Sequence, residues 1–405
     1  MEKVTFDMIK EAAETIKGSV KRTQIIECPT MEKLTGNKVF FKLENLQKTG
    51  SFKVRGALNK IMHLTDEEKA RGVIASSAGN HAQGVALGAT NLGIKSTIVM
   101  PGTAPLSKVM ATRGYGAEVV QVGTVYDDAY KKACEIQAET GATFLHPFND
   151  KHVIAGQGTI GLEIFEQLND KVDTILCPIG GGGLIAGVAV AAKALNPNVK
   201  VIGVQTVNIP SMHESMKNGQ VSSAFKSTTI ADGIAVKTPG DMTFEIIKEL
   251  VDEVVLVEEE EIAQGIVYLM ENLKVVAEGS GAVTTAALLS GKYAPKENEN
   301  VVCIISGGNV DVNNLYRIIG SGLAKEGRRY SFSVTMIDKP GGFSELTKII
   351  SENNANILNA NQSRLSSGAY IGKQNAEFVL ETFDNEHIQK IKSDIEAAGF
   401  EIKDL

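Results

Sequence analysis

The fold of this chain is decided by one segment near its middle, Thr174-Ile175-Leu176-Cys177-Pro178-Ile179-Gly180-Gly181-Gly182-Gly183-Leu184. Its first five residues have the length and apolar character of a buried parallel strand, and a helical pattern follows the glycines. Four successive amides without side chains can close around an oxyanion, and a helix N-terminus favours negative charge. The segment therefore predicts a phosphate site, with a simple strand-to-helix turn as the alternative. Its contiguous glycines match neither a dinucleotide-binding fingerprint nor a P-loop.

Short apolar segments rich in β-branched residues recur on both sides of this one. Between them lie amphipathic stretches such as Val54, Leu58, Ile61 and Met62, whose spacing places an apolar stripe along one helix. This alternation is typical of an α/β fold with helices on both faces of open, mostly parallel sheets. We expect two such sheets. The predicted strands are 39–43, 73–76, 96–100, 119–122, 174–178, 201–204 and 301–305.

The composition changes after Gly320, where a charged connector leads into a new pattern. Residues 331–337 alternate like a strand and residues 343–350 have helical spacing. Segments 356–364 and 376–382 resemble two more strands, 388–395 a second helix and 400–402 a last short strand. This βαββαβ order predicts a ferredoxin-like domain at 331–405, joined by a linker at 323–330 to two α/β subdomains within 1–322.

Composition and charge disfavour several classes of protein. A net charge of −7 argues against a general binder of nucleic acid, which needs clustered Lys and Arg. We find no export signal and no apolar stretch of the roughly 18 residues that span a bilayer, so we expect a cytoplasmic protein without a membrane segment. The cysteines lack paired spacing, and we predict no metal site from them. They are Cys28, Cys134, Cys177 and Cys303.

A lysine at the start of a predicted helix is the second candidate for chemistry. Lys53 lies in Thr49-Gly50-Ser51-Phe52-Lys53-Val54-Arg55-Gly56-Ala57. The positive end of a helix disfavours an ammonium and helps to keep the neutral amine that imine formation requires. A solvated surface lysine is the alternative.

Two more segments directly follow predicted strands. Ser76-Ser77-Ala78-Gly79-Asn80-His81 offers amides and hydroxyls to a carboxylate, and His81 is either a base or a structural hydrogen-bonding residue. In Ser306-Gly307-Gly308-Asn309 a hydroxyl can face a bound ring, or the glycines form only a turn. Open α/β sheets collect ligands at the carboxyl ends of their strands, so we expect these segments to converge.

Together these motifs resemble those of the pyridoxal-phosphate enzymes of the tryptophan-synthase-β fold, and in particular the threonine dehydratases (threonine ammonia-lyases). The resemblance covers residues 5–320, and residues 330–405 are similar to an ACT regulatory domain. The matching segments are Lys42-Leu43-Glu44, Ser51-Phe52-Lys53, Ser77-Ala78-Gly79-Asn80-His81, Gly180-Gly181-Gly182-Gly183-Leu184, Ala231-Asp232-Gly233-Ile234-Ala235, Ser306-Gly307-Gly308-Asn309 and Asp338-Lys339-Pro340-Gly341-Gly342.

The resemblance implies a role for each matching residue. Lys53 would carry pyridoxal 5'-phosphate covalently and remove the α-proton of the substrate. Asn80 would bind the hydroxyl of the cofactor ring and Ser306 would face its nitrogen, where a hydroxyl makes the ring a weaker electron sink than a buried Asp would. The remaining cofactor contacts would be Phe52, Gly180, Gly181, Gly182, Gly183, Leu184 and Gly233. The substrate would lie on Ser77, Ala78, Gly79, Asn80 and His81.

The implied reaction is the deamination of L-threonine to 2-oxobutanoate and ammonia, with L-serine giving pyruvate. Ala78 stands where the racemase relatives place a second serine, and a methyl group cannot act as an acid. Gln205 stands where some relatives carry a glutamate at a cation site, which weakens the case for a divalent ion. The alternatives are a β-replacement enzyme such as a cysteine synthase, a serine racemase, and an amino-acid sensor without catalysis.

The ACT-like segment implies an amino-acid effector, with isoleucine or valine expected in a biosynthetic role. The effector would bind near Asp338, Gly341, Gly342 and Phe343. A packing or dimerisation module is the alternative for this segment. Paired ACT domains and the habit of the family suggest a homodimer or homotetramer.

Overall fold

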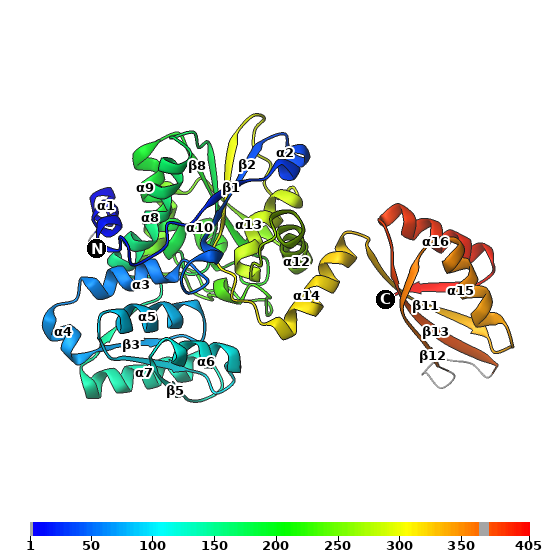
Figure 1. Cartoon of the computed structure of the whole chain (residues 1–405), viewed down its shortest axis with the longest axis horizontal. Coiled ribbons are helices and arrows are strands. Elements are labelled where there is room, and N and C mark those ends of the chain that lie inside the picture. The colour runs from blue at the N-terminus through cyan, green and yellow to red at the C-terminus, as the bar shows by residue number, and fades with distance from the viewer. Residues whose placement is uncertain (1–2, 364–371) are drawn as a thin grey trace. The chain divides into compact units, whose positions relative to one another are not determined.

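The computed structural model describes residues 3–363 and 372–405. The chain divides into two compact units, Met1–Leu315 and Tyr316–Leu405 (Figure 1). The first unit contains a six-stranded and a four-stranded sheet, and the second contains a four-stranded sheet. The domain limits that we derived from the sequence stay a prediction.

The larger sheet of the first unit is parallel except at one edge. Its order is β1-β2-β10-β7-β8-β9, with β1 antiparallel to β2. Strand β7 precedes the four glycines and lies inside the sheet, where it pairs with β10 on one side and with β8 on the other. The strands are β1 (Ile25–Glu27), β2 (Lys38–Leu43), β7 (Thr174–Pro178), β8 (Lys200–Thr206), β9 (Glu253–Val257) and β10 (Asn300–Ile305).

Helices cover both faces of this sheet. On one face, Val302 and Ile304 of β10 belong to a buried cluster with residues of α8 (Lys151–Gln167) and α9 (Gly183–Leu195). The residue between them, Cys303, contacts α13 (Gly279–Leu289), because successive side chains of a strand point to opposite faces. The other helical elements around this sheet are α1 (Phe6–Thr15), α2 (Pro29–Thr35), η1 (Glu44–Leu46), α10 (Ser211–Asn218), η2 (Asp232–Ile234), α11 (Asp241–Leu250), α12 (Glu259–Tyr268) and η3 (Leu269–Leu273).

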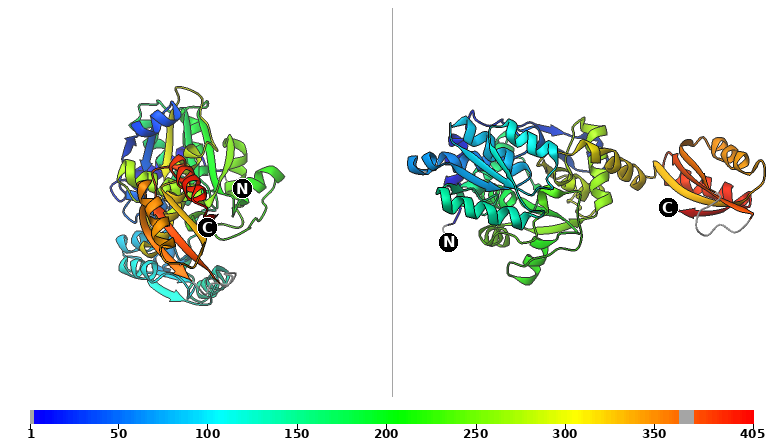
Figure 2. Two further views of the ribbon diagram at one scale, coloured as in Figure 1. Left: turned by 90° about the vertical axis from the view of Figure 1, so that its right-hand side faces the viewer. Right: turned by 90° about the horizontal axis from the view of Figure 1, so that it is seen from below.

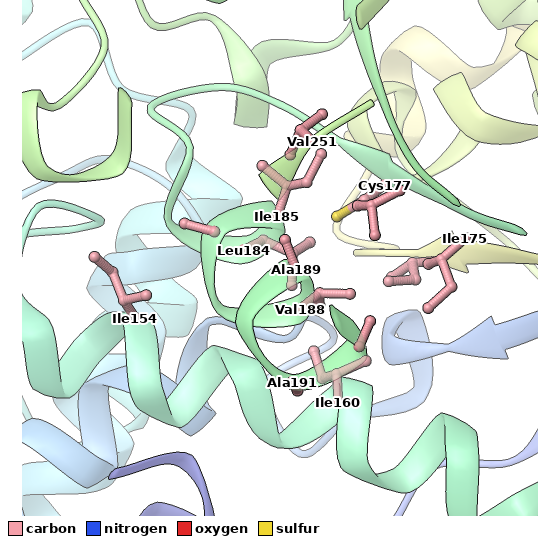
Figure 3. Packing of buried hydrophobic residues seen from close by; sticks show 14 of the residues in the cluster. Ile154, Ile160, Ile175, Cys177, Leu184, Ile185, Val188, Ala189, Ala191 and Val251 are labelled. Atoms are coloured by element: carbon pink, nitrogen blue, oxygen red, sulfur yellow. The ribbon is translucent and has the colours of Figure 1, made fainter. Parts of the chain in front are cut away.

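Helices α8 and α9 approach each other closely because a glycine lies at their contact. A Cβ at Gly187 of α9 would lie 2.3 Å from the carbonyl oxygen of Ile154 in α8. Apolar side chains fill the surrounding space, and Figure 3 shows Val188 of α9 beside Ile175 of β7. This packing holds the N-terminus of α9, at Gly183, next to the end of β7.

The smaller sheet of the first unit is parallel throughout its described strands, in the order β5-β4-β3-β6. Helix α5 packs against the start of α3, since a Cβ at Gly84 of α5 would lie 3.1 Å from backbone atoms of Lys53 and Val54. The strands are β3 (Val73–Ser76), β4 (Ser96–Met100), β5 (Glu118–Gln121) and β6 (Thr143–Phe144). The helices are α3 (Lys53–Met62), α4 (Asp66–Arg71), α5 (Asn80–Asn91), α6 (Leu106–Gly114) and α7 (Tyr126–Thr140).

The second unit has the predicted ferredoxin-like order. Its sheet runs β12-β13-β11-β14 and is antiparallel, and helices α15 and α16 cover one face of it, as Figures 1 and 2 show. Alternate residues of β11, such as Phe332 and Val334, are buried beneath the helices with Leu346 and Ile391. The elements are α14 (Val312–Lys325), which begins in the first unit, β11 (Arg329–Ile337), α15 (Gly342–Glu352), β12 (Asn356–Ser363), β13 (Lys373–Glu381), α16 (Asn385–Ala397) and β14 (Glu401–Asp404).

The α/β fold class predicted from the sequence is confirmed. Strands 73–76, 96–100 and 174–178 have the predicted bounds, whereas β1, β6 and β9 were not predicted. All three missed strands lie at sheet edges, and β1 and β6 have only three and two residues, too few to show a pattern. Position 364, predicted as a strand end, lies outside the described residues. Among the helices that the structure describes, none is long and apolar enough to span a membrane.

Candidate active site

A cavity of about 630 Å³ opens in the first unit and receives side chains from the elements around both sheets. Each site residue predicted within this unit lines it. They are Phe52, Lys53, Ser77, Ala78, Gly79, Asn80, His81, Gly180, Gly181, Gly182, Gly183, Leu184, Gly233 and Ser306. Segments far apart in the sequence thus converge because parallel strands bring their carboxyl ends to one edge of each sheet.

Lys53 is the first residue of α3, and its amine is aimed at the backbone of the opposite wall. The Nζ atom donates to the carbonyl oxygen of Pro147 at 2.9 Å and lies 5.2 Å from the centre of the Phe52 ring. Burial lowers the pKa of Lys53 to about 8, although the carboxyl of Glu278 opposes this shift. We expected a lowered pKa from the helix end, but removal from water is the main cause. About a tenth of the amine is therefore neutral at pH 7, far more than for a lysine in water.

The loop after β3 presents small residues to the cavity. The Ser77 amide donates to the carbonyl oxygen of Val99 at 3.1 Å, which ties the loop to β4, and α5 begins at Asn80. His81 is buried, and its Nε2 atom lies 2.9 Å from the carbonyl oxygen of Leu145. Burial and the charge of Lys53 lower the pKa of His81 to about 3, so its ring is neutral. These contacts favour the structural alternative for His81 over a role as a base.

A carboxyl that we did not predict as a site residue orients Asn80. Glu278 is buried, and its Oε1 atom accepts a hydrogen bond from Nδ2 of Asn80 at 2.7 Å. The Asn80 Oδ1 atom accepts from Nδ2 of Asn309 at 2.8 Å, so both ends of the amide are held. Burial raises the pKa of Glu278 to about 7, with the charge of Asp232 adding to the shift. The available signal in the sequence was an acid directly before the glycine-rich start of a helix.

The four glycines form a cradle that side chains would fill. Gly182 has a φ of 97°, and a Cβ there would lie 2.8 Å from the Thr243 side chain. At Gly181 a Cβ would lie 2.4 Å from the ring of Phe148. Helix α9 begins at Gly183 without a side-chain cap, so its first amides remain available to an anion. The cradle fits a phosphate group.

Two hydroxyls line the cavity, that of Ser306 directly after β10 and that of Ser280 in α13. Ser306 Oγ donates to the carbonyl oxygen of Ser280 at 3.3 Å. The Ser280 hydroxyl is buried and has no hydrogen-bond partner among the described residues. Hydroxyls placed in this way fit a polar ring atom of a ligand, because a buried hydroxyl without a partner is costly. Ser280 was not predicted as a site residue.

Comparison with known proteins agrees with this geometry. Residues 16–307 match the family of pyridoxal-phosphate dependent enzymes, and residues 330–400 match the ACT domain. The chain belongs to the pyridoxal-phosphate dependent enzymes. The combination of a phosphate cradle, a buried lysine amine and the unpartnered hydroxyl of Ser280 fits the cofactor of this family, and the predicted cofactor and ACT domain are confirmed.

Relatives of this pyridoxal-phosphate dependent enzyme share most of its length. It is 52% identical to an L-threonine ammonia-lyase of Thermotoga maritima over 99% of both chains. Among solved structures, maize serine racemase is 38% identical with a TM-score of 0.75, over 80% of this chain and 99% of that one. The processed form of threonine deaminase isoform 2 from Solanum lycopersicum is 37% identical, with a TM-score of 0.74, over 78% of this chain and 87% of that one. None of the described residues forms a cluster of side chains suited to a metal ion.

Proposed function

We propose that this enzyme deaminates L-threonine to 2-oxobutanoate and ammonia by α,β-elimination, and L-serine to pyruvate. The observation that carries the proposal is the buried Lys53 amine, whose pKa is about 8, facing a loop of small residues in the same cavity as the glycine cradle. The 52% identity to an L-threonine ammonia-lyase supports the choice of reaction.

Each part of the cavity has a separate task in this proposal. Bound pyridoxal phosphate supplies an electron-withdrawing ring that weakens the bond between the substrate Cα and its proton. Lys53 carries the cofactor and, as a neutral amine, removes the α-proton. The loop at Ser77 binds the substrate carboxylate through its amides. The cradle at Gly182 anchors the phosphate, and Asn80, held by its neighbours, keeps one amide hydrogen for the ring hydroxyl.

The residues also favour elimination over the related reactions. A racemase needs a second acid or base on the opposite side of the substrate, and the loop has the methyl group of Ala78 there. Ser306 lies where a residue facing the ring nitrogen is expected, and a hydroxyl stabilises a protonated ring less than a carboxylate does. A β-replacement enzyme would share the fold, but the whole-length relative and the ACT domain favour the deaminase.

The test is oxo-acid release by the purified enzyme with pyridoxal phosphate. We expect 2-oxobutanoate from L-threonine, slower pyruvate from L-serine and none from D-serine. Lys53→Ala should abolish release and the visible absorbance of the bound cofactor, because the amine that carries the cofactor is lost. Unchanged release by Lys53→Ala would refute the assignment of the base. Absence of any oxo acid from the wild type would favour a replacement enzyme.

The second unit is proposed to bind an amino-acid effector. Gly341 has a φ of 90° and caps α15, whose first turn contains Gly342 and Phe343, and Asp338 lies just before it. The amide of Gly342 donates to the carbonyl oxygen of Lys339 at 3.5 Å, and the positive end of the helix beyond it suits the carboxylate of an amino acid. If the role is biosynthetic, isoleucine or valine should alter the rate of 2-oxobutanoate release, and Asp338→Ala should weaken the response. We also propose a homodimer or homotetramer, which light scattering would test.

A further inference from the structure

An ion pair crosses the wall of the cavity and joins its two halves. Lys108 lies on α6, beside the smaller sheet, and Asp232 lies on η2, beside the larger one. The ammonium of Lys108 contacts Oδ2 of Asp232, and both residues line the cavity that contains Lys53. The Lys108 side chain is 17% exposed and that of Asp232 is 54% exposed. The cation is thus the more buried member of the pair, and its carboxylate partner is the more exposed one.

Among the charged groups that line the cavity, Lys108 is the cation that could pair with a carboxylate of the substrate. Lys53 is committed to the cofactor in the proposed function. The Lys237 ammonium lies 4.6 Å from the centre of the Phe225 ring and is directed there. Glu278, which holds Asn80, and Asp127 bring negative charge rather than positive. A ligand with a second carboxylate would therefore find a cation at Lys108, provided that Asp232 did not already occupy it.

Lys108 and Asp232 have opposite electrostatic effects on the groups near them in the cavity. Their influence reaches the cofactor side of the wall, since Asp232 raises the pKa of the Glu278 carboxyl and Lys108 lowers it. With both present, the pair itself carries no net charge and suits an uncharged side chain such as that of threonine. A second substrate carboxylate would have to displace Asp232, which would then remain nearby as an unpaired negative charge.

We propose that Asp232 determines specificity by neutralising Lys108, so that the cavity selects hydroxy amino acids with uncharged side chains against those with a second carboxylate. This inference rests on the proposed deaminase function. Loss of the Asp232 charge should leave Lys108 free to bind an acidic side chain, such as that of L-threo-3-hydroxyaspartate. That substrate would lose its β-hydroxyl as water, and hydrolysis by one water would yield oxaloacetate and ammonia. No oxidant or further reactant is required.

The test compares two substrates in three variants. We would measure kcat/KM for L-threonine and for L-threo-3-hydroxyaspartate in the wild type, Asp232→Asn, Lys108→Met and the double variant. The ratio of hydroxyaspartate to threonine should rise at least about tenfold in Asp232→Asn, because attraction between full charges in a partly buried site is worth that much. It should return to the wild-type value in the double variant, and added salt should reduce the gain.

The double variant distinguishes neutralisation of Lys108 by Asp232 from a contact that only closes the cavity. If the pair only closed the cavity, breaking it from either side would change both substrates alike, so an equal ratio in Asp232→Asn and the double variant would overturn the proposal. An unchanged ratio in Asp232→Asn that still deaminates threonine would do the same. Asp232→Ser serves as a second test of charge loss, and cofactor absorbance reports that each variant is folded. A wild type inactive on threonine would instead overturn the proposed function, and this inference with it.

Discussion

A buried network of charged side chains near the start of α3 allows a sharp test of what stabilises the protein around Lys53. Arg55, two residues after Lys53, is fully buried and donates to Glu44 at 2.8 Å and to Glu163 at 2.7 Å. Lys42 donates to the other oxygen of Glu163 at 2.5 Å. Replacing Arg55 by Met keeps an apolar chain of similar length but removes the cation that both carboxylates share.

The expected loss is about 3–5 kcal/mol in the free energy of unfolding, the usual cost of leaving a buried charge without its partner. It should depend on pH. In the wild type, Arg55 holds the pKa of Glu44 below its usual value despite burial. The stabilisation is therefore fully present at pH values above the usual pKa of the unfolded chain. It is lost as the pH falls through the lower pKa of the folded protein. Without Arg55, burial would raise this pKa, and protonation would relieve the penalty at mildly acidic pH. The difference between variant and wild type should therefore shrink as the pH is lowered.

The assay is urea unfolding of the holoenzyme, followed by the absorbance of the cofactor, at about pH 8 and about pH 5. Arg22→Met is the matched control, because Arg22 pairs with Glu166 on the same helix as Glu163, but with side chains 56% and 64% exposed. An exposed pair contributes at most about 1 kcal/mol. The reasoning is refuted if Arg55→Met costs no more than Arg22→Met, or if its cost grows on acidification.

Three further variants probe the cavity itself. Gly182→Ala should lower the free energy of unfolding by about 2–5 kcal/mol and release the cofactor during gel filtration, because it adds a clash to a left-handed backbone. The control is Gly219→Ala, where φ is 71° and the space is open. It should lower the free energy of unfolding by only about 1–2 kcal/mol, measured by thermal unfolding. Glu278→Gln removes a charge that raises the pKa of Lys53, so the acidic limb of the pH–rate profile should move to lower pH; an upward shift would contradict this. Ser306→Asp should increase exchange of the α-proton with D₂O relative to oxo-acid release, and an unchanged ratio would argue that residue 306 does not face the ring nitrogen.

Several elements could be predicted from the sequence because their surroundings are uniform. Strands β3, β4 and β7 are buried, so each apolar segment is as long as the strand that it forms. Strand β9 was missed although residues 254–257 are all apolar, because acidic residues flank this short run on both sides and it lies at an edge of the sheet. Position in the sheet depends on pairing between segments remote in the chain.

The candidate site divides in the same way. The motifs around Lys53, Asn80 and Ser306 are visible locally, because chemistry needs particular residue types at the ends of strands. The part played by Glu278 was not visible, since its contact with Asn80 joins residues 198 positions apart. The protonation states of His81 and Glu278 were equally hidden, because they follow from burial rather than from neighbouring residues.

The sequence by itself thus determined the α/β alternation, the glycine cradle, the lysine at the head of α3 and the βαββαβ order of the second unit. Periodicity and glycine spacing are local properties, which the printed residues already carry. Only the tertiary structure decided that Lys108 meets Asp232 across the cavity, and that Lys53 loses enough water for its pKa to fall to about 8. Charge balance and desolvation depend on every segment that surrounds a group, and those segments come together only in the folded chain.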